Sequence, residues 1–539
     1  MARPGGRSML LPMRPRLLVT MALLGSALAV AVGAAPPSGA APASCAISQL
    51  TETTGGTNFA NAGPRISRNG AVVAFESSRD HTGQNADANQ EIFRLVVASG
   101  AFQQVSNTTG GTFANRAPAL DDDGTDIVFT SNRNIGGDNA DNNLEIAHWT
   151  GGGMFSGLEV LTDSGAGSSG GATISADDAY VAFRSTGDLT GGNGDGSDEI
   201  FLQRLSDDSV TQVTDTTGGN TGEPALDATG ASLAFGSDRQ FGTANADGSY
   251  EVWQYTRATG TIRPRTTTGA GSTSAYPDLS NNGRRLAFAS DGTFNGRNAD
   301  GNFEAFLRED PAGSLSTLSS GPGGTFGLGG VAVSGAGTRV VFDSDDPALG
   351  DNADGGFEIY LRDFGAGVRT TQVTNLATGG AGEVDINGAG TRVVFSSTAD
   401  IVGDNADGNR EIFLATCSAP PAPVTCDGHL VTADRARGQQ GSAGNDVIRG
   451  RNVNDTINAG GGNDRVCALN GNDTVSGGPG NDRIFGQAGA DRARGDGGND
   501  RLDGSTGPDV LNGGPGSDTC LGGPGPDSAA ACEARLGIP

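Results

Sequence analysis

The stretch that decides the fold is "TRVVFSSTADIVGDNADGNREIFLATC", residues 391–417. An apolar run that ends at Phe395 is followed by a polar loop and then by a second apolar run that begins at Glu411. Both landmarks recur at intervals of 52 to 54 residues. The Glu recurs at Glu91, Glu145, Glu199, Glu251, Glu304, Glu358 and Glu411, and the Phe at Phe75, Phe129, Phe183, Phe235, Phe288, Phe342 and Phe395. Two landmarks with the same spacing indicate seven copies of one structural unit.

Each copy contains four short runs that are typical of strands, separated by polar or Gly-rich turns. The chain has 539 residues, of which 90 are Gly and only 5% are aromatic, so long amphipathic helices are not expected. Four strands in 52 to 54 residues match one blade of a β-propeller. The sequence therefore predicts an all-β protein with a seven-bladed β-propeller over residues 45–417.

The ends of this region predict how the ring closes. The seventh copy reaches Cys417 without a fourth strand, and the missing strand is found at the N-terminal side as "CAISQLT", residues 45–51. If this strand completes blade 7, Cys45 lies beside Cys417 on a neighbouring antiparallel strand. We therefore expect a Cys45–Cys417 disulfide that closes the ring.

The units resemble the WD40-like repeats of TolB-type β-propellers, through the polar turn, the "RVVFSS" run and the "DGNREIFL" run. The resemblance covers about two thirds of the chain. It implies the propeller fold but no single function, because such propellers serve as binding platforms, as gating domains of peptidases and as sugar-active enzymes.

After a Pro-containing linker over residues 418–440 the period changes to nine. Asp recurs without a slip at Asp446, Asp455, Asp464, Asp473, Asp482, Asp491, Asp500, Asp509, Asp518 and Asp527. Rows such as "GGPGNDRIF" place an apolar residue two positions after most of these Asp. The pattern resembles the hemolysin-type (RTX) calcium-binding nonapeptide repeat. It predicts a parallel β-roll over residues 441–532, followed by a tail over 533–539.

The repeated Asp are candidate calcium ligands for a physical reason. Two nine-residue rows form one coil, so Asp that are 18 residues apart stack along one edge of the roll. Two carboxylates about 5 Å apart repel by roughly 3 kcal/mol at an effective dielectric constant near 20. Calcium prefers such all-oxygen sites, so we expect this segment to be disordered without calcium and to fold on binding it. The alternative is a Gly-rich roll with only vestigial metal binding.

The seven propeller loops share the pattern N-x-D-x-[NSG]-x-E. Oxygen-bearing side chains at alternate positions resemble calcium loops in general, which makes each loop a second candidate metal site. The candidate ligands include Asn85, Asp87, Asn89 and Glu91 in the first copy and Asn405, Asp407, Asn409 and Glu411 in the last. The alternative is turn chemistry alone, because Asn and Asp favour such turns and Glu can accept from backbone amides.

The N-terminus predicts export. Four Arg precede an apolar run from Leu17 to Val32, and small residues follow it. We expect a signal peptide over residues 1–35 and a linker over 36–44, so that the mature chain has no membrane span; a retained anchor is the alternative. All six Cys lie beyond the signal, which suggests disulfides in a secreted protein. The last four Cys allow three pairings, and we expect Cys426–Cys467 and Cys520–Cys532.

The function class follows from charge and from the motifs that are missing. A net charge of -27 argues against nucleic acid as a partner and suits divalent cations or simple solubility. The sequence predicts no catalytic residue: "GSSGG" at 167–171 lies in an inter-blade turn, each of the three His is expected at the surface, and both Trp are expected in the core. The resulting hypothesis is a secreted calcium-binding module whose propeller binds an extracellular protein or glycan. The alternative is an extracellular propeller hydrolase or lyase acting on a glycan or peptide.

Overall fold

The computed structural model describes residues 45–538, apart from 55–60, 110–114, 152–156, 295, 297, 311–312, 320–325, 351, 353, 365–367, 420–424, 428, 432 and 435–439. The expected signal peptide (1–35) and the linker (36–44) lie outside the described residues. Among the described residues there is no helix, and none could therefore cross a membrane as a long apolar helix.

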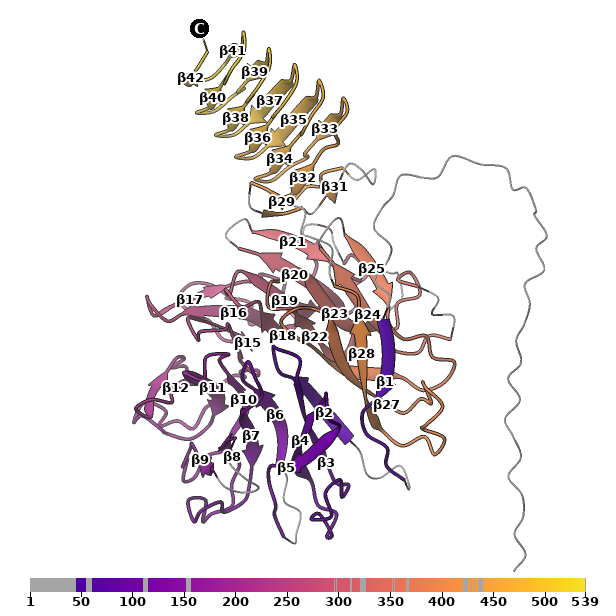
Figure 1. The fold of residues 1–539 in the computed structure, drawn as a ribbon. Coiled ribbons are helices and arrows are strands. Elements are labelled where there is room, and N and C mark those ends of the chain that lie inside the picture. Colours follow the sequence, from indigo (N-terminus) through magenta and orange to yellow (C-terminus); the bar gives the residue numbers. More distant parts are fainter. Residues whose placement is uncertain are drawn as a thin grey trace, which may run out of the picture. The chain divides into compact units, whose positions relative to one another are not determined.

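The first 28 strands form seven four-stranded antiparallel sheets, the blades of a propeller (Figure 1). The blades are: blade 1, β2 (Asn61–Ile66), β3 (Val72–Ser77), β4 (Glu91–Val96) and β5 (Ala101–Gln104); blade 2, β6 (Asn115–Leu120), β7 (Asp126–Ser131), β8 (Glu145–Thr150) and β9 (Leu158–Val160); blade 3, β10 (Ser169–Ile174), β11 (Tyr180–Ser185), β12 (Glu199–Arg204) and β13 (Ser209–Gln212); blade 4, β14 (Ala225–Leu226), β15 (Ser232–Ser237), β16 (Glu251–Thr256) and β17 (Thr261–Pro264); blade 5, β18 (Ser274–Leu279), β19 (Arg285–Ser290), β20 (Glu304–Glu309) and β21 (Ser314–Thr317); blade 6, β22 (Phe326–Val333), β23 (Arg339–Ser344), β24 (Glu358–Asp363) and β25 (Arg369–Gln372); blade 7, β26 (Ala381–Ile386), β27 (Arg392–Ser397), β28 (Glu411–Cys417) and β1 (Cys45–Gln49).

The repeated apolar runs are the second and third strands of each blade. They are buried on both faces because each sheet packs between two neighbours, which explains why they read as continuous apolar runs. In blade 7, Phe395 pairs with Phe413 across the two strands, and their rings stack with centroids 5.6 Å apart. Trp149 and Trp253 occupy third strands and are fully buried, as expected.

The ring closes as the sequence predicts. Strand β1 pairs antiparallel with β28, with Cys45 opposite Cys417, and so supplies the fourth strand of blade 7. A disulfide joins these two residues across a sequence separation of 372. Closure removes the exposed sheet edges that would otherwise invite pairing with other chains.

The C-terminal strands form a parallel β-solenoid of about five turns with two sheets (Figure 1). One sheet contains β31 (Ala433–Asp434), β32 (Val447–Arg449), β34 (Arg465–Cys467), β36 (Arg483–Phe485), β38 (Arg501–Asp503), β40 (Thr519–Leu521) and β42 (Ala534–Leu536); the other contains β33 (Thr456–Asn458), β35 (Thr474–Pro479), β37 (Arg492–Gly497), β39 (Val510–Asn512) and β41 (Ser528–Ala530). Residues 18 apart are in register, such as Ile484 and Leu502, and the middle side chain of most strands is buried. Strand β42 continues the first sheet within the expected tail.

Two further disulfides lie in the C-terminal region, Cys426–Cys467 and Cys520–Cys532. The first connects the small hairpin β29 (Thr425–Cys426) and β30 (His429–Leu430) to strand β34. This hairpin lies within the segment that the sequence predicts as a linker.

Candidate metal centre and channel

The ten repeated Asp of the solenoid form two columns. In each column the backbone N–H of one Asp donates to the carboxylate of the Asp 18 residues later, as from Asp464 to Oδ1 of Asp482 at 2.8 Å. The same bond recurs from Asp446 to Asp464, Asp482 to Asp500 and Asp500 to Asp518, and from Asp455 to Asp473, Asp473 to Asp491, Asp491 to Asp509 and Asp509 to Asp527. The stacking at intervals of 18 residues that the period predicts is therefore confirmed.

The second carboxylate oxygen distinguishes the ends of the columns from their interiors. At the first positions Oδ2 has donors: Ser442 N for Asp446 and Arg451 N for Asp455, each at 2.6 Å. In the eight later Asp, Oδ2 is buried and has no hydrogen-bond partner among the described residues: Asp464, Asp473, Asp482, Asp491, Asp500, Asp509, Asp518 and Asp527. A buried carboxylate oxygen without a partner is costly, so each of these positions requires a donor or a cation.

The repeated geometry around these oxygens fits a cation. A Cβ placed on Gly477 would come within 2.2 Å of Asp482 Oδ2 and 2.8 Å of the carbonyl oxygen of Gly495. On Gly495 it would meet Asp500 Oδ2 at 2.1 Å and the Gly513 carbonyl oxygen at 2.5 Å. Only Gly therefore fits there, and carboxylate and carbonyl oxygens converge beside it. This donor set is the one that calcium prefers.

The raised pKa values of the column Asp are also consistent with a cation site. Burial raises the pKa of Asp464 to about 8 and that of Asp482 to about 7, and neighbouring Asp of the column add to the effect. Burial likewise raises the pKa of Asp473 and of Asp509 to about 6. Without a cation, burial in the folded columns therefore favours the neutral form of these carboxyl groups, most strongly at Asp464 and Asp482, whereas calcium binds the charged form.

Known families agree with this geometry. The RTX calcium-binding nonapeptide repeat (4 copies) matches residues 440–475, 468–502 and 494–529. The C-terminal solenoid is an RTX roll. Among curated proteins, none matches the chain.

Solved structures are similar to this chain at low sequence identity. An oligogalacturonate lyase from Vibrio parahaemolyticus is 11% identical, with a TM-score of 0.48, over 70% of this chain and 96% of that chain. TolB from Acinetobacter baumannii is 16% identical, with a TM-score of 0.34, over 62% of this chain and 61% of that chain. A TolB-like protein from Agrobacterium tumefaciens is 18% identical, with a TM-score of 0.35, over 52% of this chain and 87% of that chain.

In contrast to the RTX roll, the seven propeller loops contain clear turn chemistry. The Asn at the first motif position donates its side-chain amide to the carbonyl oxygen of the fifth, as from Asn405 to Asn409 at 2.9 Å. The residue at the fourth position has a positive φ in every loop: Ala88, Asn142, Gly196, Gly248, Gly301, Gly355 and Gly408. This explains why Gly is frequent at that position.

The motif Glu of blade 1 caps the turn that leads to the next blade. Glu91 accepts hydrogen bonds from the Ser106 hydroxyl, from the backbone and hydroxyl of Thr108, and from the Asn115 amide. Burial raises the pKa of Glu91, although these hydrogen bonds oppose the shift. In blade 7, Glu411 accepts equivalently from Thr51, Thr53 and Asn61.

The other candidate ligands of these two loops lie on both sides of the turn. Asp87 and Asp407 are exposed. The side-chain oxygens of Asn85, Asn89, Asn405 and Asn409 are buried and have no hydrogen-bond partner among the described residues. The structure therefore assigns each Glu to turn capping and leaves the Asn oxygens as the unexplained part of the motif.

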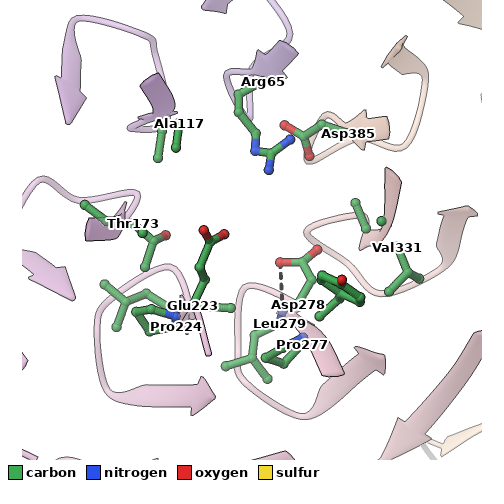
Figure 2. A pocket seen from close by; sticks show the side chains of 18 of the residues that line it. Arg65, Ala117, Thr173, Glu223, Pro224, Pro277, Asp278, Leu279, Val331 and Asp385 are labelled. Atoms are coloured by element: carbon green, nitrogen blue, oxygen red, sulfur yellow. Dashed lines mark hydrogen bonds between the residues drawn. The ribbon is translucent and has the colours of Figure 1, made fainter. Parts of the chain in front are cut away.

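The propeller also encloses a channel of about 930 Å³ that is lined by the innermost strands of all seven blades (Figure 2). Six of these strands contain a β-bulge with a residue of positive φ, such as Ala117 in β6 and Tyr276 in β18. The bulge interrupts the ladder and turns the strand, so residues that differ between blades line the cavity. Tyr276 is 46% exposed there.

Two of the channel carboxylates hold neighbouring blades together. Asp278 Oδ2 accepts from the backbone N–H of Val333, and Asp385 Oδ2 accepts from that of Ile66, at 2.7 and 2.9 Å. Burial raises the pKa of Asp278 to about 6 and also raises that of Asp385. Figure 2 shows Asp385 beside Arg65, and Asp278 on the part of the cavity wall where Glu223 lies. Each of these carboxylates therefore joins the innermost strands of two blades through a hydrogen bond.

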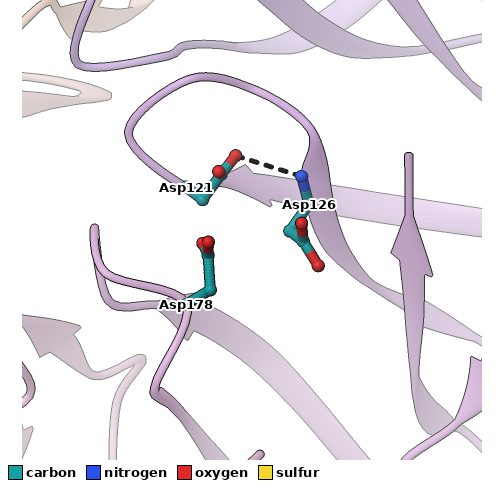
Figure 3. A group of neighbouring side chains, drawn as sticks. All are labelled: Asp121, Asp126 and Asp178. Carbon is teal, nitrogen blue, oxygen red and sulfur yellow. Dashed lines mark hydrogen bonds between the residues drawn. The ribbon is translucent and has the colours of Figure 1, made fainter.

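A third acidic group lies between blades 2 and 3, where Asp121, Asp126 and Asp178 approach within 4.8 Å of one another (Figure 3). Asp126 pairs with His148, whose Nε2 lies 2.8 Å away. Burial raises the pKa of Asp121 to about 7, so protonation relieves part of the repulsion. The expectation that every His lies at the surface is wrong for His148 and His429, which are 4% and 9% exposed. Both ring nitrogens of His148 face carboxylates, those of Asp126 and Glu159.

The repeat pattern did not predict the channel residues, because they occupy the positions at which the copies differ. One signal was present: Pro64, Pro118 and Pro277 lie at equivalent positions of three innermost strands, and Pro224 directly precedes a fourth, β14. Pro cannot donate to a strand ladder and is frequent at bulges. Its recurrence at the blade spacing could have indicated the channel wall.

Proposed function

We propose that this chain is a secreted calcium-binding module in which the RTX roll folds on calcium and the propeller channel binds an extracellular protein or glycan. The observation that carries the proposal is the set of eight buried Asp Oδ2 atoms that have no hydrogen-bond partner among the described residues. The Asp of the two columns, from Asp446 to Asp527, would hold the calcium together with Gly carbonyl oxygens. Bound calcium would supply positive charge at the buried Oδ2 atoms, where no donor is found among the described residues.

Secretion is supported by two independent features. The three disulfides of the structure suit an oxidising compartment, and the N-terminal sequence has the charge and apolar pattern of an export signal. Extracellular calcium is also abundant enough to occupy sites that bind with dissociation constants of about 10⁻⁴–10⁻³ M.

The channel supports a binding role for the propeller. Its innermost strands expose blade-specific residues, including Tyr276, whereas Asp278 and Asp385 are occupied by backbone amides. An exposed aromatic residue beside polar groups can stack on a sugar ring or receive an apolar side chain.

Calcium titration of the purified full chain after chelation tests the first part. We expect a gain of β signal in far-ultraviolet circular dichroism together with heat release in calorimetry. Full β structure in excess chelator, with no heat on adding calcium, would overturn the proposal. Binding of Tyr276→Ala and of the unsubstituted chain to glycan arrays and to the native secretome tests the second part. Equal binding by both chains would exclude a channel role.

A further inference from the structure

We propose that the interface between blades 2 and 3 is a pH-sensitive joint of the ring, which is tight in acid and loosens as the pH rises through neutrality. Its facing parts are the turn before β7, residues 121–125, and the turn before β11, residues 175–179. The contacts that close the other six interfaces are missing or reversed in charge at this one. The inference goes beyond the proposed function, because it requires no ligand in the channel and no calcium in the roll.

Main-chain hydrogen bonds join the turns before the second strands around the ring. From blade 1 to blade 2, the backbone N–H of Asn69 donates to the carbonyl oxygen of Asp122 at 3.0 Å. Five further interfaces have such a bond, at 2.8–3.3 Å: Asp177 to Ala228, Ala228 to Asn281, Asn281 to Gly335, Gly335 to Gly388 and Gly388 to Arg68. Within the described part of the chain, none joins the turns of blades 2 and 3. The ring of main-chain bonds is therefore open at this interface.

Side-chain packing closes the same six interfaces. The fourth residue of each turn is a Gly of positive φ, and the first residue of the second strand in the preceding blade covers it. A Cβ on Gly124 would lie 2.5 Å from Cβ of Val72, and a Cβ on Gly230 would lie 2.8 Å from Cδ2 of Tyr180. The other four pairs are Ser232 with Gly283, Arg285 with Gly337, Arg339 with Gly390 and Arg392 with Gly70.

The corresponding pair at the interface between blades 2 and 3 is Asp126 with Asp178. A carboxylate oxygen of each lies within 4.8 Å of the other and of one from Asp121 (Figure 3). Like charges therefore meet at the position where the other interfaces pack a side chain against Gly. Charged carboxylates at this distance repel, so the interface is most stable when part of the group is protonated.

The third strand of blade 2 also lacks a contact that other blades make. In blade 1, Nε of Arg94 donates to the carbonyl oxygen of Gly124 in the next turn at 2.8 Å. In blade 4, the Gln254 amide donates to the carbonyl oxygen of Gly283 at 3.1 Å. His148 occupies the same position, three residues after the motif Glu, but its ring nitrogens face carboxylates of its own blade.

Protonation strengthens the contacts that this interface does have. An imidazolium at His148 donates to Asp126 and Glu159, 2.8 and 3.1 Å away, whereas a neutral ring donates to only one of them. Burial lowers the pKa of His148, but these two carboxylates outweigh burial and raise it overall. Burial raises the pKa of Asp121 to about 7 and also raises the pKa of Asp178, and the charges of neighbouring Asp add to both shifts.

The remaining charged groups that face the cluster come from the two turns and from blade 1. Three exposed Asp of the turns add negative charge: Asp122, Asp123 and Asp177. The guanidinium of Arg94 attracts Asp121 and Asp123 from blade 1. The hydroxyl of Thr125 lowers the pKa of Asp123, which is therefore charged throughout the neutral range. One Arg against this number of Asp leaves the interface negative at neutral pH.

The raised pKa values give the interface one direction of response. A group whose pKa is raised by folding stabilises the fold below its unfolded pKa, and this stabilisation is lost as the pH rises through the folded pKa. The shifts of Asp121, Asp178 and His148 therefore act together, and the interface weakens as the pH rises through about 7. Residues of β6 and β10 line the channel, so a weakened interface also loosens this part of the channel wall.

Hydrogen exchange of the full chain in saturating calcium tests the proposal. Exchange is measured at about pH 5.5 and about pH 8 and corrected for the intrinsic pH dependence of amide exchange. We expect residues 120–126 and 174–180 to exchange about tenfold faster at the higher pH, because one unit of pKa shift corresponds to a tenfold change in an equilibrium constant. The equivalent turns of blades 4 and 5, residues 226–232 and 279–285, should keep their protection.

The decisive variant is Asp178→Asn, which removes one charge and keeps a residue that tolerates positive φ. Its matched control is Asp208→Asn, because Asp208 is also an exposed residue of blade 3 with the same φ of 55° but lies in the turn before β13. We expect Asp178→Asn to reduce the pH-dependent loss of protection by at least half and the control to leave it unchanged. Asp178→Gly, which introduces the residue of the other six blades, should act like Asp178→Asn.

Three results would overturn the proposal. The first is protection of the two turns that stays constant or increases as the pH rises. The second is an equal loss of protection in the turns of all blades, because the response would then belong to the whole propeller. The third is an unchanged response in both Asp178 variants. Each of these results would leave calcium binding by the roll and ligand binding by the channel untouched.

Discussion

Both parts of the chain bury a carboxylate in each repeat, but they neutralise it by different means. In blade 1, Glu91 accepts four hydrogen bonds from Ser106, Thr108 and Asn115. In the RTX roll, Asp482 accepts one backbone N–H at Oδ1, while its buried Oδ2 has no partner among the described residues. The propeller therefore contains the donors that its acids require, whereas the roll leaves that role to a cation. Without metal, the propeller should therefore remain folded, whereas the roll should not.

Protonation of the column Asp at low pH should stabilise the folded roll in the absence of calcium. This is the largest effect that we expect. The folded-state pKa is raised to about 8 for Asp464 and to about 7 for Asp482, whereas an unfolded Asp has a pKa near 3.8. A raised folded-state pKa stabilises the fold fully below the unfolded pKa, and this stabilisation is lost as the pH rises through the folded pKa. In chelator, the roll should therefore be folded near pH 4 and should unfold between pH 6 and 8. Circular dichroism of the full chain against pH measures this. A roll that gains structure as the pH rises in chelator would contradict it.

Loss of the ring-closing disulfide should lower the free energy of unfolding of the propeller by about 5 kcal/mol and leave that of the roll unchanged. The Cys45–Cys417 disulfide closes a loop of 372 residues, and loop entropy predicts a stabilisation of that size. The double substitution Cys45→Ser with Cys417→Ser should lower the urea midpoint reported by the fluorescence of the two buried Trp. The pair Cys520→Ser with Cys532→Ser is the control, since both Trp lie in the propeller and should not respond. An equal decrease of the urea midpoint in both double variants would contradict independent stability of the propeller and the roll.

Removing one propeller carboxylate should destabilise the chain by about 3 kcal/mol in a calcium-independent way. Glu411→Ala removes the carboxylate that accepts hydrogen bonds from Thr51, Thr53 and Asn61. A buried donor without a partner costs about 1–3 kcal/mol. Urea unfolding in calcium and in chelator measures the loss, with the exposed Asp407→Asn as the control. A loss that appears only when calcium is present would move Glu411 from turn capping to metal binding.

Removing one roll carboxylate should have a smaller effect that depends on calcium. Asp482→Asn deletes one charged ligand from the middle of a column, and we expect the calcium midpoint of roll folding to rise by about tenfold, which is about 1.4 kcal/mol. Asp503→Asn, in the same roll but outside the columns, should leave the midpoint unchanged. Identical midpoints for both variants would show that the columns do not set calcium affinity.

Repetition explains how much of this molecule could be predicted from its sequence. Seven equally spaced Glu and Phe predicted the blades, and the surplus strand at residues 45–51 predicted the closure. The nine-residue Asp period predicted the columns, because a solenoid brings residues 18 apart together by its geometry alone.

The remaining features depend on contacts between blades, which one repeat does not encode. The environment of His148 follows from Asp126 and Glu159, which face its two ring nitrogens. The channel wall is formed by bulges where the copies differ. Such positions look like ordinary variation until the fold shows which residues face one another.

Hydrogen exchange of the full chain, measured with calcium and with excess chelator at neutral pH, tests the central contrast most directly. We predict that amides of strands such as β36 and β38 are protected only with calcium, whereas those of β3 and β27 are protected in both conditions. Equal protection of the roll strands with and without calcium would contradict the account, because the buried Asp columns would then be stable without any metal.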